Sequence, residues 1–365
     1  MGRKIAVVLF NLGGPDKAES VQPFLKNLFR DPAIITAPLP IRFVLARLIS
    51  KSRAPMVVQN YAMMDAGGGS PLLPETEAQA EALQAELAKR LPNDEVRCFI
   101  AMRYWHPFTE EAARDVKAWG ADEVVLLPLY PQFSTTTTGS SLTAWNRAYK
   151  GMSRTICCYP FEDSFIDAHV ERIMQAWEKA GRPENVSLLL SAHGLPEKIV
   201  KAGDPYQWQC ETMAEMIAGR VPPDWEITAC YQSRVGPLKW ISPATEEVVE
   251  EKAKAGKNIL IAPIAFVSEH IETLVELGEE YRLLAEQHGA PSYTRVEALG
   301  THPDFISMLA GETVEALQMK TPVRSCAGDR LCPQGFSGCP HKQAAHKPGM
   351  VVNGMVVNKS AEVVR

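Results

Sequence analysis

Apolar residues in this chain gather in short unbroken runs, and longer stretches with helical spacing lie between them. The runs at residues 5–10, 124–129, 188–190 and 259–262 are rich in Val, Ile and Leu. Such runs are typical of strands that are buried on both faces of a parallel sheet. Their alternation with helices predicts an α/β fold whose right-handed crossovers place helices on both faces of the sheet.

The two halves of the chain repeat this pattern. A helical stretch over 109–120 leads into a strand at 123–129, and a second one over 245–256 leads into a strand at 259–264. The first strand of each half ends in a turn that contains glycine and proline. We therefore predict two similar Rossmann-like lobes with a ligand cleft between them. The expected segments are an N-terminal lobe at 1–150, a C-terminal lobe at 151–320, a cysteine-rich extension at 321–345 and a tail at 346–365.

Composition narrows the class of protein. The 365 residues are 46% hydrophobic and 22% charged, as in an ordinary globular protein. A net charge of −5 and the lack of a basic run argue against nucleic acid as a partner. No apolar stretch reaches the roughly 20 residues of a membrane-spanning helix. Residues 1–10 resemble the start of a secretory signal, but no small-residue cleavage site follows, so we predict a first buried strand and a cytoplasmic protein.

Acidic residues follow the apolar run at 258–265. Ser268 is a suitable N-cap, so the pattern predicts a helix that begins there. Glu269, Glu272 and Glu276 have the spacing i, i+3 and i+7, which predicts that they share one face of this helix. Such a cluster is suited to hold a divalent metal ion or to relay protons.

His193 ends another predicted strand, in the same half of the chain. Open parallel sheets bind ligands at the carboxyl ends of their strands, so we expect His193 and the acidic cluster to face the same cleft. The alternative interpretation is a solvated acidic helix face, and it fits Glu279 and Glu280 best.

Seven short motifs, in order along nearly the whole chain, resemble those of ferrochelatases. They lie at 11–15, 67–71, 103–107, 131–141, 191–196, 232–237 and 268–274. Each is short, but the ordered set is highly specific. Ferrochelatases are lyases that insert Fe²⁺ into a porphyrin, with release of two protons, in the last step of haem synthesis. The resemblance implies this reaction on protoporphyrin IX, with haem as product, and a class II chelatase-like fold around a porphyrin cleft.

The resemblance also implies roles for individual residues. His193 matches the active-site histidine of the family and acts as base, as iron ligand or as both. Glu272 matches the essential carboxylate, and Glu276 and Glu269 extend the acidic set. The expected substrate-binding residues are Leu12, Arg103, Tyr104, Ser134, Trp240 and Phe266. Leu12 favours protoporphyrin IX, because the branch that uses coproporphyrin tends to carry Tyr there.

Three cysteines crowd one polar loop near the C-terminal end: Cys326, Cys332 and Cys339. Some ferrochelatases hold a [2Fe–2S] cluster on three such cysteines and one earlier residue. The earlier position of the animal pattern is Thr135 here, so we expect Cys158 or its neighbour Cys157 as the fourth ligand. The alternatives are Zn²⁺ bound by the three thiols and His341, or free thiols.

Residues 37–53 mix large apolar and basic residues. Two interpretations stay open: peripheral contact with an anionic membrane, and an ordinary packed helix. Cluster-bearing relatives include homodimers, so we expect a homodimer. The alternative functions are a chelatase for coproporphyrin III or a cobalt-precorrin, a non-catalytic porphyrin or haem carrier, and, on the cysteines alone, an Fe–S electron-transfer protein.

Overall fold

The computed structural model describes residues 2–64, 69–234 and 236–341, together with short strands at 351–352 and 355–356. The predicted tail at 346–365 lies almost wholly outside these described residues, as does the end of the predicted extension. None of the helices in the described part is long and apolar enough to cross a membrane.

The chain forms two compact units. The first comprises residues 1–130, 135–156 and 309–322, and the second comprises residues 131–134, 157–308 and 323–365. The short segments at 131–134 and 309–322 therefore belong to a different unit from their neighbours in sequence. The sequence pattern predicts neither exchange.

The first unit contains a parallel sheet in the order β2-β1-β3-β4. Its strands are β1 (Lys4–Asn11), β2 (Glu95–Met102), β3 (Glu123–Pro128) and β4 (Arg154–Ile156). Side chains from Ile5 to Phe10 have no exposed surface, because β1 is covered on both faces. Burying one such side chain, for example Leu9, stabilises the fold by about 1.5–3 kcal/mol.

The first unit also contains helices. They are η1 (Ala18–Ser20), α1 (Val21–Arg30), α2 (Leu39–Ala62), α3 (Leu72–Arg90), α4 (Thr109–Trp119) and α5 (Thr138–Ala148). α4 and α5 pack on the sheet through a core that includes Val116 and Trp145. Gly120 ends α4 with φ of 75°, a left-handed conformation that glycine adopts without strain.

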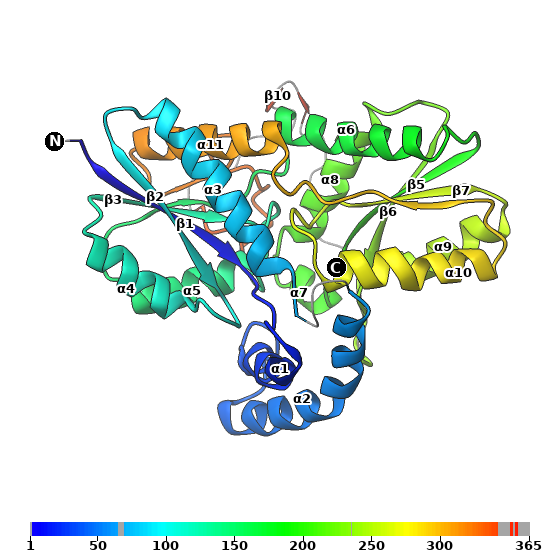
Figure 1. Cartoon of the computed structure of the whole chain (residues 1–365), viewed down its shortest axis with the longest axis horizontal. Coiled ribbons are helices and arrows are strands. Elements are labelled where there is room, and N and C mark those ends of the chain that lie inside the picture. The colour runs from blue at the N-terminus through cyan, green and yellow to red at the C-terminus, as the bar shows by residue number, and fades with distance from the viewer. Residues whose placement is uncertain (1, 65–68, 235, 342–350, 353–354, 357–365) are drawn as a thin grey trace. The chain divides into compact units, whose positions relative to one another are not determined.

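The second unit repeats the topology, with a parallel sheet in the order β6-β5-β7-β8. Its strands are β5 (Val186–His193), β6 (Glu226–Gln232), β7 (Asn258–Pro263) and β8 (Tyr293–Arg295). α6 (Asp163–Lys179) lies on one face, and α9 (Thr245–Lys254) and α10 (Tyr281–Gln287) lie on the other (Figure 1). The predicted α/β class, with two similar parallel sheets flanked by helices, is thereby confirmed.

The remaining elements connect or extend these layers. They are α7 (Glu197–Lys201), α8 (Tyr206–Ala218), the π-helix η2 (Glu272–Glu280), α11 (Pro303–Gln318), β9 (Val323–Arg324) and the antiparallel pair β10 (Val351–Val352) and β11 (Met355–Val356). α11 begins in the second unit and ends in the first.

Candidate active site

The predicted site of the second unit lies at the carboxyl ends of β5 and β7. β5 ends at His193, and its two neighbours in the sheet are β6 and β7. The chain passes from β5 to β6 on one side and then to β7 on the other, so the strand order reverses at β5. Parallel sheets bind ligands at such a switch point. The site predicted from the sequence lies at this point of the fold.

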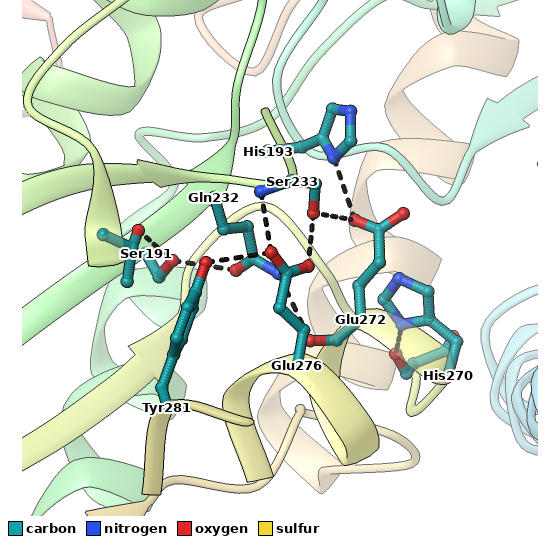
Figure 2. A network of polar contacts seen from close by, with 10 residues as sticks. Ser191, His193, Gln232, Ser233, His270, Glu272, Glu276 and Tyr281 are labelled. Atoms are coloured by element: carbon teal, nitrogen blue, oxygen red, sulfur yellow. Dashed lines mark hydrogen bonds and ion pairs between the residues drawn. The ribbon is translucent and has the colours of Figure 1, made fainter. Parts of the chain in front are cut away.

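His193 pairs with Glu272 at the start of η2 (Figure 2). The distance between His193 Nδ1 and Glu272 Oε2 is 2.9 Å. Ser233, just after β6, donates its hydroxyl to Glu272 Oε2 over 3.3 Å and also to Glu276. Ser233 has φ of 62°, in the left-handed region that non-glycine residues rarely adopt. This conformation places its hydroxyl and its N–H beside the two carboxylates.

Glu276 is held by several donors. Its carboxylate accepts hydrogen bonds from Gln232 Nε2 over 3.1 Å, from the Ser233 N–H over 2.8 Å and from the Tyr281 hydroxyl over 2.9 Å. Ser191 in β5 donates to Gln232 Oε1 over 2.8 Å and so fixes the orientation of that amide. The result is one continuous polar network from His193 to Tyr281 (Figure 2).

The helix that carries the two carboxylates differs from the predicted one. The prediction that it begins at Ser268 is wrong, because η2 begins at Glu272 with Ile271 as its N-cap residue. Glu269 therefore precedes the helix and does not share its face. Its carboxylate accepts from Arg295 Nη1 over 2.7 Å and from the Ala298 N–H over 2.9 Å. The structure thus brings Glu272 and Glu276 together with His193 and commits Glu269 to Arg295.

The network sets the protonation of its members. Burial alone would lower the pKa of His193, but the charge and hydrogen bond of Glu272, and then the charge of Glu276, raise that pKa above its ordinary value. Burial opposes ionisation of Glu272, but the His193 charge and hydrogen bond outweigh it and lower the pKa of Glu272 to about 2. The His193 side chain is 39% exposed, and the charge and hydrogen bond of Glu272, together with the charge of Glu276, outweigh the cost of its burial.

Two predicted aromatic residues lie beside His193. The Phe266 ring meets the His193 ring edge-on, with centroids 6.5 Å apart, and lies 4.5 Å from the buried His270 ring. Trp240 lies against the residue that follows His193, because a Cβ atom at Gly194 would be 3.2 Å from its ring. Glycine at 194 therefore allows this close approach. The structure brings Phe266 and Trp240 to the same strand end as His193.

Three other predicted substrate residues lie in the first unit. Leu12 and Tyr104 are neighbours, since the Tyr104 N–H donates to the Leu12 carbonyl over 2.9 Å. Arg103 forms an ion pair with the buried Asp31 over 2.7 Å and donates from Nε to Ser140 over 2.7 Å. The Tyr104 hydroxyl also donates to Asp31, over 2.8 Å. The guanidinium of Arg103 thus has partners within its own unit.

Ser134 lies in the second unit but outside the His193 network. It is buried, and its hydroxyl donates to Asp204 Oδ2 over 3.0 Å. Asp204 also accepts from the Tyr206 N–H over 3.0 Å at the start of α8. The contacts of Ser134 are therefore those of a residue that holds α8 in place.

The cysteines of the C-terminal loop meet two earlier cysteines. All five side chains are at least 94% buried: Cys157, Cys158, Cys326, Cys332 and Cys339. The Cys326 N–H donates to the Cys158 carbonyl over 3.0 Å, so backbone pairing joins the two segments. Gln209 Nε2 donates to the sulfur of Cys158 over 3.5 Å and to that of Cys332 over 3.2 Å.

Comparison with known proteins agrees with this geometry. The family model described as ferrochelatase matches residues 4–317. The chain belongs to the ferrochelatase family. It is 76% identical to a ferrochelatase of Hyphomonas neptunium over 350 residues, which are 96% of this chain and 98% of that protein. It is 57% identical to a ferrochelatase of Caulobacter vibrioides over 347 residues, which are 94% of this chain and 99% of the relative.

A solved structure of a related fold is SirB from Bacillus subtilis with Fe³⁺. It superposes with a TM-score of 0.50 at 13% identity, over 86% of this chain and 95% of that chain. At this identity the likeness supports the fold alone, and it agrees with the predicted class II chelatase-like architecture.

Sequence reasoning missed several residues of the polar network around His193. Gln232 and Ser233 lie in the motif at 232–237, so the resemblance could have identified them as candidates. Tyr281 and Arg295 carried no signal, because their partners Glu276 and Glu269 are recognised only once the loop after β7 is folded.

Proposed function

We propose that this chain is a ferrochelatase that inserts Fe²⁺ into protoporphyrin IX in the last step of haem synthesis. Membership of the family supports the reaction. The observation that carries the proposal is the His193–Glu272 pair at the switch point of the second sheet, continued by Glu276.

Metallation requires a base for two pyrrole protons and a route for them to leave. His193 Nδ1 contacts Glu272, so Nε2 is the nitrogen that takes a pyrrole proton. The proton charge then lies beside an ionised carboxylate, which stabilises the imidazolium. Ser233 contacts both Glu272 and Glu276 and so bridges them, which gives the proton a hydrogen-bonded path along η2.

Anaerobic turnover tests this function. Purified full-length protein, protoporphyrin IX and Fe²⁺ are followed by loss of porphyrin fluorescence and growth of haem absorbance. We expect His193→Ala to lose at least 100-fold in rate, since a positioned general base contributes about 10²–10⁴-fold. Porphyrin binding should persist in the variant. A matched control is His288→Ala, because His288 lies after α10, away from the network.

The alternatives give different results in the same assay. A porphyrin or haem carrier binds the ring without metallating it, and His193→Ala leaves it unchanged. A chelatase of other specificity turns over faster with coproporphyrin III or with Co²⁺ than with protoporphyrin IX and Fe²⁺. Either result would contradict the proposal.

We further propose that Cys158, Cys326, Cys332 and Cys339 hold a [2Fe–2S] cluster. The support is a set of buried thiols that two segments of the chain bring together, and thiolates are the donors that such clusters use. Gln209 donates to both Cys158 and Cys332, which favours Cys158 over Cys157 as the fourth ligand. When bound, such a cluster supplies a one-electron centre and a cross-link between the loop and the sheet.

A single Zn²⁺ fits these thiols less well. Sulfur ligands about 2.3 Å from one zinc ion lie about 3.8 Å apart. In the described part of the chain, no three Cys or His ligand atoms lie within 4.8 Å of one another. Among the described residues, no three of these thiols therefore have the spacing that one ion requires.

Iron and sulfide analysis with electron paramagnetic resonance of the reduced protein tests the cluster. We expect two irons and two sulfides per chain, lost in Cys158→Ser and kept in Cys157→Ser and in Cys98→Ser. Zinc in place of iron, or an unchanged cluster in Cys158→Ser, would contradict the ligand set.

Peripheral contact with an anionic membrane is a third part of the proposal. Most of the exposed large apolar side chains of the described residues lie between residues 34 and 63, including Leu39, Phe43 and Leu48. Basic residues lie among them in α2. This composition suits a helix that rests on anionic headgroups.

Co-sedimentation with anionic vesicles measures this contact. We expect Phe43→Gln with Leu48→Gln to release the protein, and Met152→Gln, at an 88% exposed position elsewhere, to leave binding intact. Equal sedimentation of all variants would contradict the assignment to α2. Homodimer formation and the cytoplasmic location stay predictions, to be measured by sedimentation velocity and by cell fractionation.

A further inference from the structure

A second cluster of metal-ligand side chains lies away from the residues described above. Glu171 belongs to α6, and His302 and Asp304 flank Pro303 at the start of α11. One ligand atom from each residue lies within 4.8 Å of the others. All three residues belong to the second unit, and Figure 1 shows α6 along one face of its sheet. None of them takes part in the His193 network or in the group of buried thiols.

The spacing of the donor atoms suits one ion. His302 Nε2 and Glu171 Oε2 are 3.3 Å apart. Two ligands that each lie about 2.1 Å from a tetrahedral ion are about 3.4 Å from each other. The His302 imidazole and the Glu171 carboxylate therefore already have the separation expected of two ligands on one ion. Asp304 lies close enough to provide a third donor after a small side-chain rotation.

The histidine is buried without a full set of partners. His302 is 6% exposed, and within the described part of the chain its Nδ1 has no hydrogen-bond partner. His169, which also lies in α6, is 3% exposed, and its Nε2 likewise has no partner among the described residues. The ring nitrogen that meets Glu171 is Nε2, so Nε2 is the nitrogen available to an ion, and the unpartnered Nδ1 is the other nitrogen of the ring.

The carboxylates lack a competing cation. Among the described residues, neither Glu171 nor Asp304 forms an ion pair with Lys or Arg. Arg172, which follows Glu171 in sequence, is directed elsewhere: its Nη1 is 3.7 Å from Glu297, and its Nη2 donates to the Leu299 carbonyl over 3.4 Å. Two exposed carboxylates thus lie beside a buried imidazole, and neither is paired with a Lys or Arg in the part of the chain that the structure describes.

We propose that Glu171, His302 and Asp304 bind one divalent first-row transition-metal ion, with water as the remaining ligand. An imidazole with two carboxylates suits Zn²⁺, Co²⁺ or Fe²⁺ better than Mg²⁺ or Ca²⁺, which take oxygen ligands alone. The ion links α6 to the start of α11. The site is separate from the porphyrin chemistry, and the proposal does not depend on the proposed function.

Calorimetric titration of the full-length protein with Co²⁺ tests this site. Cobalt is the probe because its visible absorption reports tetrahedral ligation and separates oxygen and nitrogen ligands from thiolates. We compare His193→Ala with the same protein that also carries Glu171→Gln or Asp304→Asn. His193→Ala weakens the other expected metal site, so bound Co²⁺ with nitrogen and oxygen ligands can be assigned to the Glu171–His302–Asp304 site.

We expect the His193→Ala protein to bind one Co²⁺ through nitrogen and oxygen ligands, and each added substitution to weaken that binding at least 10-fold. Glu171→Gln and Asp304→Asn are changes at exposed side chains, so the fold is kept. Glu178→Gln, on the same helix but outside the cluster, is the control and should leave binding unchanged. Binding of equal affinity in all variants, or no binding at all in the His193→Ala protein, would overturn the proposal.

Discussion

Replacing Glu272 by Gln removes the charge that keeps a proton on His193, so we expect the pKa of His193 to fall. Gln has nearly the same shape, and its amide oxygen can still accept from Nδ1, so the 2.9 Å contact can persist without the charge. The variant therefore isolates electrostatics from packing. Glu276 keeps its own partners and continues to act on His193 through its charge alone.

The size of the shift follows from the geometry. Two unit charges whose centres are about 4 Å apart interact by about 4 kcal/mol at an effective dielectric constant of 20 and by about 1 kcal/mol in bulk water. The side chains of His193 and Glu272 are 39% and 23% exposed, so solvent screens the pair and the lower part of this interval applies. We expect a fall of about 1–2 pKa units, since one unit corresponds to about 1.4 kcal/mol.

The same pair makes stability depend on pH. The raised pKa of His193 contributes stability that is complete below its ordinary pKa of 6.5 and is lost as pH rises through the folded-state value. The pKa of Glu272, lowered to about 2, contributes stability that is complete above its ordinary value of 4.5 and is lost as pH falls. Glu272→Gln should therefore cost most stability between these two ordinary values.

Two-dimensional NMR of the histidine side chains over a pH series measures the shift, with His193→Ala to assign the signal. Glu269→Gln is the matched control, because that carboxylate is paired with Arg295, and it should leave the pKa of His193 within about 0.3 units. A pKa of His193 in Glu272→Gln that equals or exceeds the unsubstituted value would refute the reasoning.

Three further predictions concern stability, measured by urea unfolding. Asp31→Asn should cost about 3–5 kcal/mol because it leaves the charge of Arg103 partly buried and unpaired. Glu86→Gln, at a surface ion pair with Arg90, should cost much less, and equal losses would contradict this. Leu190→Ala, at a position in β5 without exposed surface, should cost about 2–5 kcal/mol, and a loss below about 1 kcal/mol would mean that the strand is not packed as described. Tyr281→Phe should cost about 1 kcal/mol through its lost hydrogen bond and leave the pKa of His193 nearly unchanged; a large change would show that the hydroxyl acts on the charge network.

The fold could be predicted because its signal is local. Continuous apolar runs identify strands that are buried on both faces, and the runs at 5–10, 188–190 and 259–262 became the centres of β1, β5 and β7. Glycines that end helices, such as Gly120, act within one turn of the chain. Strands and helices defined in this way leave few topologies, because crossovers in parallel sheets are right-handed.

The parts that could not be predicted depend on distant contacts. Ser268 has the chemistry of an N-cap, but Arg295 holds Glu269, just after it, in the loop that precedes the helix. The helix η2 therefore begins only at Glu272, and it has i→i+5 hydrogen bonds. A helical wheel built on 3.6 residues per turn therefore placed Glu269 on the wrong surface. The pair of Arg103 and Asp31 likewise joins positions that have no relation in the sequence pattern.

The exchange of segments between the two units has a consequence for synthesis of the protein. The first unit includes residues 309–322, which follow most of the second unit in the sequence. The first unit is therefore incomplete until residue 322 has left the ribosome. At about 5–20 residues per second, translation from residue 156 to residue 322 takes about 10–30 s. During this interval the sheet built around β1 lacks a segment that helps to complete its unit. Chaperones that bind exposed apolar surface have a long time window in which to act, and a nascent chain that is arrested before residue 309 should remain sensitive to protease in both units.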